Sequence, residues 1–285
     1  MLADVMDLLA CPDCGSAVEL DERTLLCQLG HSFDVARQGY VSLLTGAASK
    51  FSGDSADMIA ARAEFLDAGH FDPIADAVVA AIRADSPDRP ARILEIGAGT
   101  GHYVAAVLDA LPDAYAVGLD VSKAAARRVA RAHDRLGSVV ADAWKQLPVR
   151  DGAVTHTLSV FSPRNVDEIR RVTAADGAFV IVTPTPHHLT ELIGPLGMVG
   201  VDEDKTRRLG DSMAGRFERT ARTPVEFTMS LDAVAVRSVV EMGPSARHLT
   251  ADQLTERIAA LPNPVAVTAS VVVSTYRPRA ATTPS

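Results

Sequence analysis

No hydrophobic stretch of this sequence is long enough to span a bilayer. The longest mainly apolar runs, residues 75–82 and 265–273, fall far short of the roughly 20 residues that a membrane helix needs. The first ten residues contain no Lys or Arg and no sustained apolar run, which excludes a secretory signal. The chain has only three cysteines, too few and too clustered for a disulfide framework. These absences predict a cytoplasmic protein without a membrane partner, whose thiols stay reduced.

The sequence also lacks an excess of positive charge. Its net charge of −8 has the wrong sign for a protein that simply coats nucleic acid. Two stretches depart from this average: residues 121–171 hold ten Lys or Arg against five acids, and residues 205–223 hold six against two. These stretches could contact phosphates, although solvated helix faces would carry the same charges.

The three cysteines form part of a pattern that suits zinc. Cys11 and Cys14 make a CxxC pair, and Cys27 with His31 makes a CxxxH pair twelve residues later. Each pair can supply two corners of a tetrahedron around one zinc ion. Four protein ligands leave no open position for catalysis, so the sequence predicts a structural site. A unit of this size, residues 1–46, needs such a metal to be stable.

Further along the chain, strands and helices alternate in the way that predicts a parallel sheet covered by helices. Two helices come first, and residues 184–230 are less regular, with several glycines that suggest a mobile lid or insertion. The expected strands cover residues 92–96, 115–119, 138–141, 155–160 and 178–183. The expected helices cover residues 57–66, 74–82, 122–135, 166–173 and 250–260, and one more runs from the glycine turn to about residue 111. Segments 234–241 and 265–276 close the domain.

A glycine-rich turn follows the first of these strands. In the run 94–101 (LEIGAGTG), Gly97, Gly99 and Gly101 let the backbone pass close to a ligand, because a side chain there would collide with it. Dinucleotide-binding proteins use similar turns, but the spacing here is GxGxG and not GxGxxG. An acid, Glu95, precedes the first glycine by two residues.

Two more acids sharpen this interpretation. Asp120 ends the second strand, where a carboxylate can accept both hydroxyls of a ribose, and Asp142 follows the third, where an acid can accept from an adenine amino group. Together with E-x-GxGxG, they resemble the pattern of class I S-adenosylmethionine-dependent methyltransferases. The resemblance implies an α/β, Rossmann-like domain in which residues 97–99, including Ala98, line the methionine and ribose, and Ala143 flanks the adenine.

The sequence resembles one methyltransferase family in particular. The segments CPDCGSAVEL, CQLGHSFDVARQGYVSLL, GDSADMIAARAEFLDAGHFDPI, LEIGAGTGHY, GLDVSK and VIVTPTPHHLTEL follow in order over most of residues 9–192, and they are similar to the RlmA family. Its members methylate N1 of a guanine in a hairpin of bacterial 23S ribosomal RNA. Ser162 in SVFSPRN resembles the branch that includes the tylosin-resistance methyltransferase of antibiotic producers, and 24 Arg against four Lys suggest a GC-rich genome. Macrolide resistance is therefore an expectation from resemblance alone.

The family's binding residues carry over to this chain at matching positions. Cys11, Cys14, Cys27 and His31 match its zinc ligands. Four further residues match positions that contact the cofactor: Phe71, where relatives have Tyr, Tyr103, Val104 and His188. The change to Phe71 removes a hydroxyl but keeps the ring. A surface pair with His187 is the alternative for His188.

The sequence does not identify the group that takes the proton from guanine N1. No Asn-Pro-Pro-Tyr motif follows the fourth strand, where Ser162, Pro163 and Arg164 stand instead as weak candidates. Pro163 would shape the turn beside the methyl group, Phe161 would pack on the target base, and Arg164 would contact a phosphate or oxygen. A plain strand-to-helix turn is the alternative.

We therefore expect a small zinc-ribbon-like, RNA-reading domain over residues 1–46 and a methyltransferase domain over 47–285, with 54–83 helical. The predicted function is S-adenosylmethionine-dependent methylation of guanine N1 in a 23S ribosomal RNA hairpin, and a homodimer is a further expectation from the family. Two alternatives remain: a small-molecule methyltransferase, which the acidic charge favours, and a zinc-ribbon interaction protein without activity. Binding of S-adenosylmethionine distinguishes the second from the others.

Overall fold

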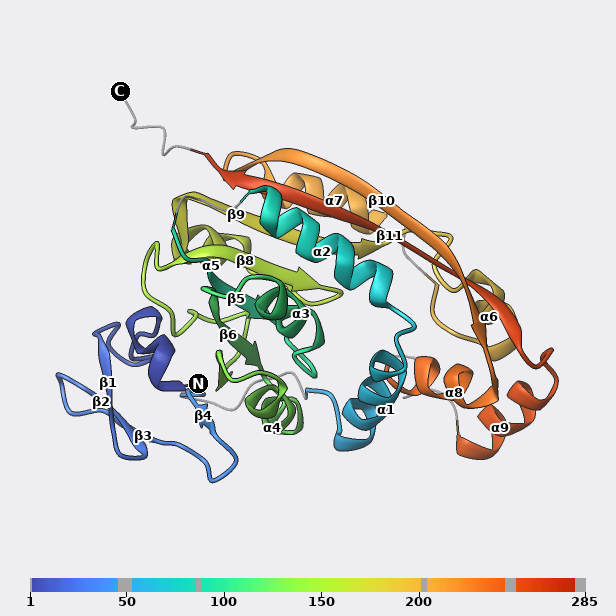
Figure 1. The fold of residues 1–285 in the computed structure, drawn as a ribbon, viewed down its shortest axis with the longest axis horizontal. Coiled ribbons are helices and arrows are strands. Elements are labelled where there is room, and N and C mark those ends of the chain that lie inside the picture. The colour runs from blue at the N-terminus through green and yellow to red at the C-terminus, as the bar shows by residue number, and fades with distance from the viewer. Residues whose placement is uncertain (1, 46–52, 86–88, 201–203, 244–249, 280–285) are drawn as a thin grey trace.

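The structure, a computed structural model, describes residues 2–45, 53–85, 89–200, 204–243 and 250–279. Its main element is an eight-stranded sheet with the order β10-β11-β9-β8-β5-β6-β7-β4, shown in Figure 1. The central strands pair in parallel, and β11 and β10 are antiparallel to their neighbours. The strands of this sheet are β4 (Tyr40–Ser42), β5 (Arg92–Ile96), β6 (Tyr115–Asp120), β7 (Leu136–Val140), β8 (Val154–Val160), β9 (Thr173–Pro184), β10 (Phe217–Leu231) and β11 (Val265–Pro278).

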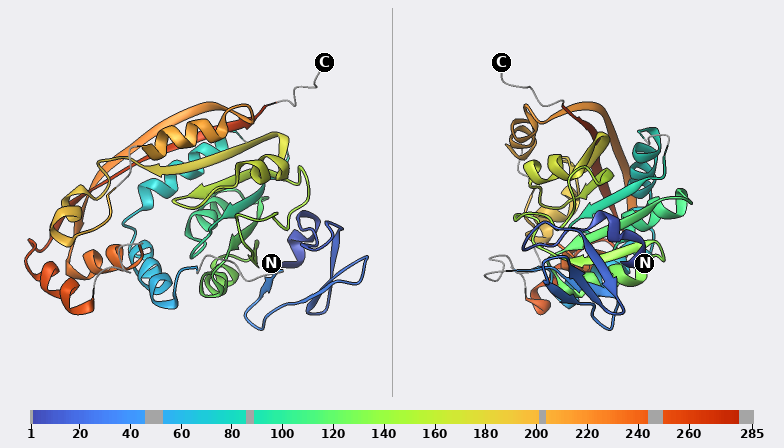
Figure 2. Two further views of the ribbon diagram at one scale, coloured as in Figure 1. Left: turned by 180° about the vertical axis from the view of Figure 1, so that it is seen from behind. Right: turned by 90° about the vertical axis from the view of Figure 1, so that its left-hand side faces the viewer.

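Helices cover both faces of this sheet, as Figures 1 and 2 show. Every residue of β7 and β8 is buried, as is usual for parallel strands covered on both sides. Neighbouring residues of β5 point to opposite faces: Ile93 packs in the cluster with α2 and α3, and Leu94 packs in the cluster with α5. The helices are α1 (Ala56–Asp67), α2 (Asp72–Ala84), α3 (His102–Ala110), α4 (Lys123–Ala132), α5 (Val166–Val172), α6 (Thr190–Leu196), α7 (Asp204–Met213), α8 (Ala233–Glu241) and α9 (Ala251–Ala259).

The N-terminal residues form a separate small unit beside the main sheet. A 3-10 helix, η1 (Leu2–Leu8), is followed by an antiparallel sheet of β1 (Val18–Asp21), β2 (Thr24–Cys27) and β3 (Ser32–Asp34). We call residues 2–34, which contain η1, these three strands and the four predicted metal ligands, the zinc ribbon. Its chain then enters β4, which pairs in parallel with β7 at the edge of the main sheet. The boundary predicted between residues 46 and 47 lies outside the described residues.

The alternating strands and helices predicted from the sequence are confirmed, and two regions differ from expectation. Residues 2–8 form η1, where no helix was expected, because one short 3-10 helix gives no periodic signal. Residues 217–231 form the long strand β10, within the segment where glycines suggested a mobile lid or insertion. The first half of β10 is mostly exposed and polar, whereas its second half alternates apolar residues (Val225, Phe227, Met229 and Leu231) with polar ones, a strand pattern that the sequence interpretation missed.

Among the described residues, no helix combines the length and apolarity that crossing a membrane would require.

The contact between η1 and β7 can be tested at one glycine. A Cβ on Gly137 would lie 2.4 Å from Cγ2 of Val5, a fully buried β-branched side chain with little freedom to move. We expect Gly137→Ala to lower the free energy of unfolding by about 1–3 kcal/mol through overpacking, measured by urea denaturation. Gly194→Ala in α6 is the control, because a Cβ there meets nothing within 4 Å. If the two variants have the same free energy of unfolding, Val5 of η1 is not tightly packed against β7.

Candidate functional site

The predicted cofactor residues come together at one edge of the main sheet. The glycine turn follows β5, Asp120 ends β6, Asp142 follows β7 and Phe161 follows β8. These strands are neighbours and run in parallel, so their carboxyl ends meet at one edge. Ligands of open α/β sheets bind at such an edge.

Hydrogen bonds hold the glycine turn against the neighbouring strand. The N–H groups of Gly97 and Ala98 both donate to the carbonyl of Leu119, at 2.8 and 3.0 Å. Gly97 has φ +68°, and a Cβ there would lie 2.5 Å from Cβ of Ser162. No side chain therefore fits at this position, because Ser162 fills the space that a Cβ would take.

The carboxylate of Asp120 is tied into the same turn. Its Oδ2 accepts from the Gly99 N–H and its Oδ1 from the Ser122 N–H, both at 2.9 Å. Burial raises the pKa of Asp120, and the two backbone N–H groups oppose that rise. Each oxygen keeps a lone pair for a further donor, which suits the two hydroxyls of a ribose. Asp142 is buried too, and its Oδ1 accepts from the Trp144 N–H at 2.9 Å.

A buried carboxyl lies at the start of the turn. Glu95 is 1% exposed, and its Oε2 has no hydrogen-bond partner among the described residues. Burial raises the pKa of Glu95 well above its usual value, and Asp120 adds to the rise. Tyr103 and Val104, in the first turn of α3, are buried beside it; a backbone hydrogen bond involving Val104 lowers the pKa of Glu95. A buried carboxyl oxygen without a partner, at the start of the glycine turn, fits a site for a polar ligand such as an adenosyl cofactor.

Three rings from distant segments meet near this edge. The ring centroids of Phe161 and His188 are 5.7 Å apart and nearly parallel, and Phe71 lies 5.8 Å from His188. Phe71 is buried, whereas Phe161 is 41% exposed and has a φ of +52°. A bulky residue rarely adopts this φ, and such strain is found most often at functional sites.

The protonation of His188 follows from its surroundings. Its Nδ1 accepts from the Ser270 N–H at 3.1 Å, so the neutral ring carries its proton on Nε2. Burial lowers the pKa of His188 to about 4. At neutral pH the ring is therefore a hydrogen-bond donor and too weak a base to take a proton from guanine.

The weak catalytic candidates are already engaged in the turn after β8. The Ser162 hydroxyl donates to the carbonyl of Ile96 and contacts the Ser159 hydroxyl at 2.9 Å, so it ties β8 to β5. Pro163 follows this contact, and its Cδ would lie 3.7 Å from a Cβ on Gly97. Burial lowers the pKa of Arg164, and the neighbouring Tyr276 opposes that change. The general base stays unidentified.

The four predicted metal ligands are brought together in the zinc ribbon. One ligand atom from each of Cys11, Cys14, Cys27 and His31 lies within 4.8 Å of all the others. The Cys14 and Cys27 sulfurs are 3.7 Å apart, and His31 Nδ1 lies 3.4 Å from the Cys27 sulfur. A tetrahedral zinc ion with Zn–S of about 2.3 Å and Zn–N of about 2.0–2.1 Å requires edges of roughly 3.8 and 3.6 Å. The donor set and its spacing therefore fit one zinc ion.

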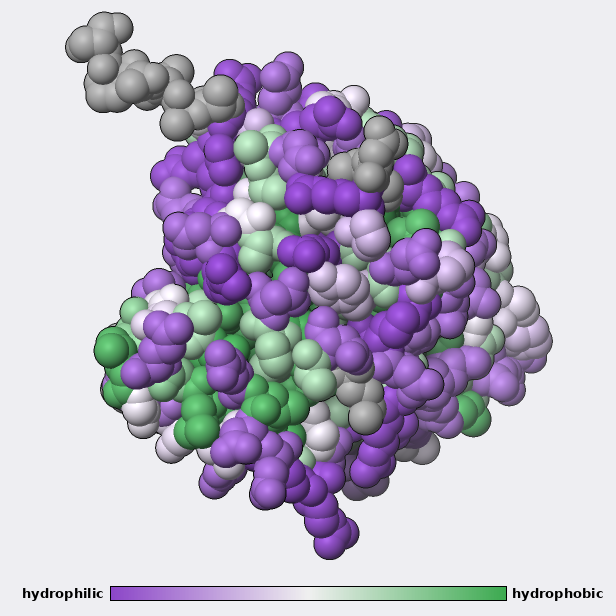
Figure 3. Space-filling model, turned by 60° about the vertical axis from the view of Figure 1, so that its left-hand side comes forward, coloured by the Kyte–Doolittle hydropathy of each residue, from purple (hydrophilic) through white to green (hydrophobic). Residues whose placement is uncertain are grey.

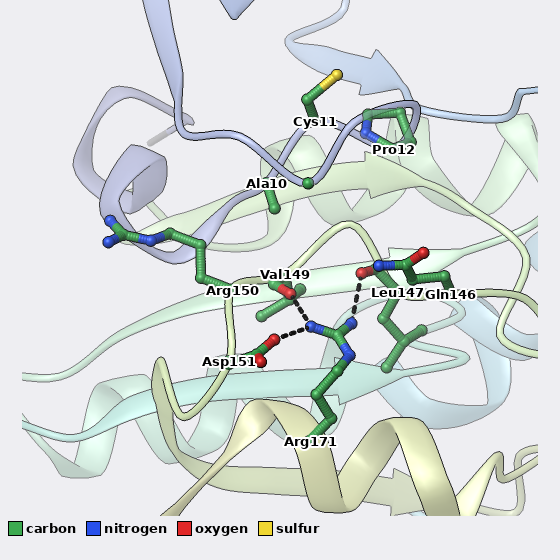
Figure 4. Close-up of a pocket in the computed structure, with 10 residues that line it drawn as sticks. Ala10, Cys11, Pro12, Gln146, Leu147, Val149, Arg150, Asp151 and Arg171 are labelled. Carbon is green, nitrogen blue, oxygen red and sulfur yellow. Dashed lines mark hydrogen bonds and ion pairs between the residues drawn. The ribbon is translucent and has the colours of Figure 1, made fainter. Parts of the chain in front are cut away.

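A cavity of about 350 Å³ separates the zinc ribbon from the methyltransferase domain (Figure 4). Arg171 lies at its base and donates to the carbonyls of Val149 and Leu147, at 2.8 and 2.9 Å. Its guanidinium also pairs with Asp151 and Glu168, at 2.7 and 2.6 Å. The charge of Arg171 is therefore already neutralised, so the cavity is a gap at the contact between the two units and not an anion-binding site.

Sequence reasoning did not identify Arg62, although its segment is specific to the family that the sequence resembles. In the structure, Arg62 of α1 lies directly over the glycine turn, with Nη1 2.9 Å from where a Cβ on Gly99 would stand. Its position depends on contacts with α8, far away in the sequence.

Family models and known relatives match the segments of the chain that contain these two sites. Residues 9–50 match the family model for the N-terminal domain of RlmA, and residues 93–179 match that for a methyltransferase domain. A protein of Streptomyces fradiae described as a 23S rRNA (guanine(748)-N(1))-methyltransferase is 45% identical, over 98% of this chain and 99% of its own. A Micromonospora griseorubida protein described as a "Putative 23S rRNA (guanine-N(1)-)-methyltransferase" is 46% identical, over 98% of this chain and 100% of its own. Among solved structures, the YcgJ protein from Bacillus subtilis has a TM-score of 0.50 at 16% identity, covering 72% of this chain and 99% of that one, which shows a common fold.

The zinc ligands can be tested without an activity assay. We expect Cys27→Ser to reduce bound zinc from about one ion per chain to well below one, because three ligands hold zinc more weakly than four. Elemental analysis of the purified protein measures this. Gln28→Ser, an exposed neighbour in the same turn, should keep its zinc. Full zinc content in the Cys27 variant would exclude that cysteine as a ligand.

Proposed function

Because the chain belongs to the family of 23S rRNA (guanine-N1)-methyltransferases, we propose that it methylates N1 of the guanine equivalent to position 748. The position comes from the Streptomyces fradiae relative, which matches this chain over both the zinc ribbon and the methyltransferase domain. An rRNA substrate implies a cytoplasmic enzyme. The homodimer and the macrolide resistance expected from the sequence stay predictions.

One observation carries the proposal: the glycine turn, Asp120, Asp142 and the exposed ring of Phe161 lie at the same edge of the sheet. When bound, S-adenosylmethionine supplies an electrophilic methyl group on a sulfonium. We propose that Asp120 accepts from the ribose hydroxyls, that Asp142 accepts from the adenine amino group, and that residues 97–101 pass under the ligand. These contacts orient the ligand, which is the main contribution that a protein makes to such a transfer.

The target guanine has to leave its stack to reach this edge. Phe161 is placed to receive it, because its ring is exposed and held in a strained conformation at the end of β8. His188 stacks on the other face of that ring and so helps to hold it in place for the base.

Two surfaces could hold the rest of the RNA. Helix α4 exposes Lys123, Arg127, Arg128 and Arg131 and contains no acid, so it provides local positive charge on an acidic protein. The zinc ribbon exposes Leu26 and Leu29, and Figure 3 shows apolar side chains gathered on that side of the molecule. Apolar and aromatic contacts suit the unpaired bases of a hairpin loop.

The proposal is tested by incubating the protein with labelled S-adenosylmethionine and 23S rRNA from a strain that lacks this modification. We expect label at one guanine, located by a stop in primer extension, since a methyl group on N1 blocks base pairing. Label at another guanine would refute the assigned position. Label on a metabolite and none on RNA would refute the RNA substrate.

The role of Phe161 is tested by Phe161→Ala. Loss of one base–aromatic stack should reduce kcat/KM for RNA by about 5- to 150-fold. Val234→Ala, which removes an exposed apolar side chain from α8, should leave it unchanged. An unaltered kcat/KM in the Phe161 variant would show that the base does not stack there.

A further inference from the structure

The guanidinium of Arg62 occupies an unusual position for a positive charge. Its Nη1 lies 2.9 Å, and its Cδ 3.4 Å, from the position that a Cβ on Gly99 would take. The cation therefore sits directly on the glycine turn, in the space that this glycine leaves open. The Arg62 side chain is 26% exposed, so water only partly screens its charge.

One half of the guanidinium is anchored and the other half is not. Nη2 forms an ion pair with Oδ2 of Asp54 at 2.7 Å and donates to the carbonyl of Met242 at 2.8 Å. Among the described residues, Nη1 has no hydrogen-bond partner. A guanidinium has five N–H donors in a fixed plane, and it favours carboxylate or phosphate groups that accept two of them.

The chemistry of the cofactor indicates which anion would meet Nη1. The adenine and ribose of S-adenosylmethionine are neutral and its sulfonium is positive, so its only anionic group is the methionyl carboxylate. Asp120 accepts from the Gly99 N–H, so the proposed ribose site lies beside the residue that Arg62 contacts. A carboxylate at the far end of the same ligand is within the reach of this turn.

We propose that Arg62 binds the methionyl carboxylate of S-adenosylmethionine and that Asp54 positions Arg62 for this contact. The proposal rests on the function proposed above. It assigns a protein contact to the methionyl part of the ligand, which Asp120 and Asp142 do not bind.

A chain of hydrogen bonds connects Asp54 to the ribose site. The Ser122 hydroxyl donates to the carbonyl of Asp54 at 2.7 Å, and the Ser122 N–H donates to Oδ1 of Asp120 at 2.9 Å. Asp120 and the Asp54–Arg62 pair are therefore held at fixed positions relative to each other. Their spacing would select a ligand in which a carboxylate is held at a fixed distance from a ribose.

The test compares two ligands that differ only in the carboxylate. S-adenosylhomocysteine has it, and S-adenosyl-3-thiopropylamine lacks it; both are titrated by calorimetry into the zinc-loaded full-length chain. We expect Arg62→Met to raise the Kd of S-adenosylhomocysteine by about 10- to 150-fold, as for a lost hydrogen bond to a charged group. The Kd of the amine should change by less than about twofold.

Arg83→Met is the matched control, because Arg83 of α2 also donates to a backbone carbonyl, that of Ala110, but lies on an exposed surface. It should leave both affinities unchanged. Asp54→Asn should weaken S-adenosylhomocysteine alone, and this effect should vanish when Arg62 is already Met, since Asp54 acts through Arg62.

Equal weakening of both ligands by Arg62→Met would overturn the proposal, because Arg62 would then only support the shape of the turn. No weakening of either would overturn it too. Arg62→Lys guards against misfolding: it keeps the charge and should retain part of the preference for the carboxylate. If the unaltered protein binds neither ligand, the proposed function itself fails, and that outcome is distinct from a failure at Arg62.

Discussion

The site depends on the way the glycine turn is fastened to the strand beside it. Two successive N–H groups, of Gly97 and Ala98, share the carbonyl of Leu119, and the next residue, Gly99, donates to Asp120. Ser162 closes the turn from the other side, because it bonds to Ile96 and leaves no room for a side chain at Gly97. Three neighbouring strands are thereby locked at one point. Asp120 and Arg62 both contact this turn, and Asp142 and Phe161 follow the nearby strands β7 and β8.

The zinc ribbon is attached to this scaffold by more than a linker. Strand β4 extends the main sheet, and Leu9 forms a bridge with Val149 on the loop before β8. The Arg150 guanidinium donates to the carbonyl of Asp7. These contacts hold the zinc ribbon in one orientation relative to the main sheet, which would suit the RNA-reading role predicted for it.

The sequence predicted those parts of the molecule that have a local signal. Strands β5 to β8 are short apolar segments between turns, and the glycines, Asp120 and the four zinc ligands belong to motifs with fixed spacing. Strand β10 was not predicted, although residues 225–231 alternate apolar and polar side chains; its exposed first half gives no such signal and is a strand because it pairs with β11. The rings of Phe71, Phe161 and His188 meet only after three segments have packed together.

Sequence reasoning also left the role of the last third of the chain open, and the structure gives that region a physical task. Strand β11 pairs with β9 only over residues 271–276, so residues 265–270 continue beyond the main sheet together with β10. This two-stranded extension carries α8, which packs against α1. The carbonyl of Met242, at the end of α8, is one of the two anchors of Arg62. A contact at the glycine turn thus depends on a residue 180 positions away in the chain. No local sequence pattern encodes such a contact. The position of Arg62, in the family-specific segment of α1, is therefore visible only in the folded protein.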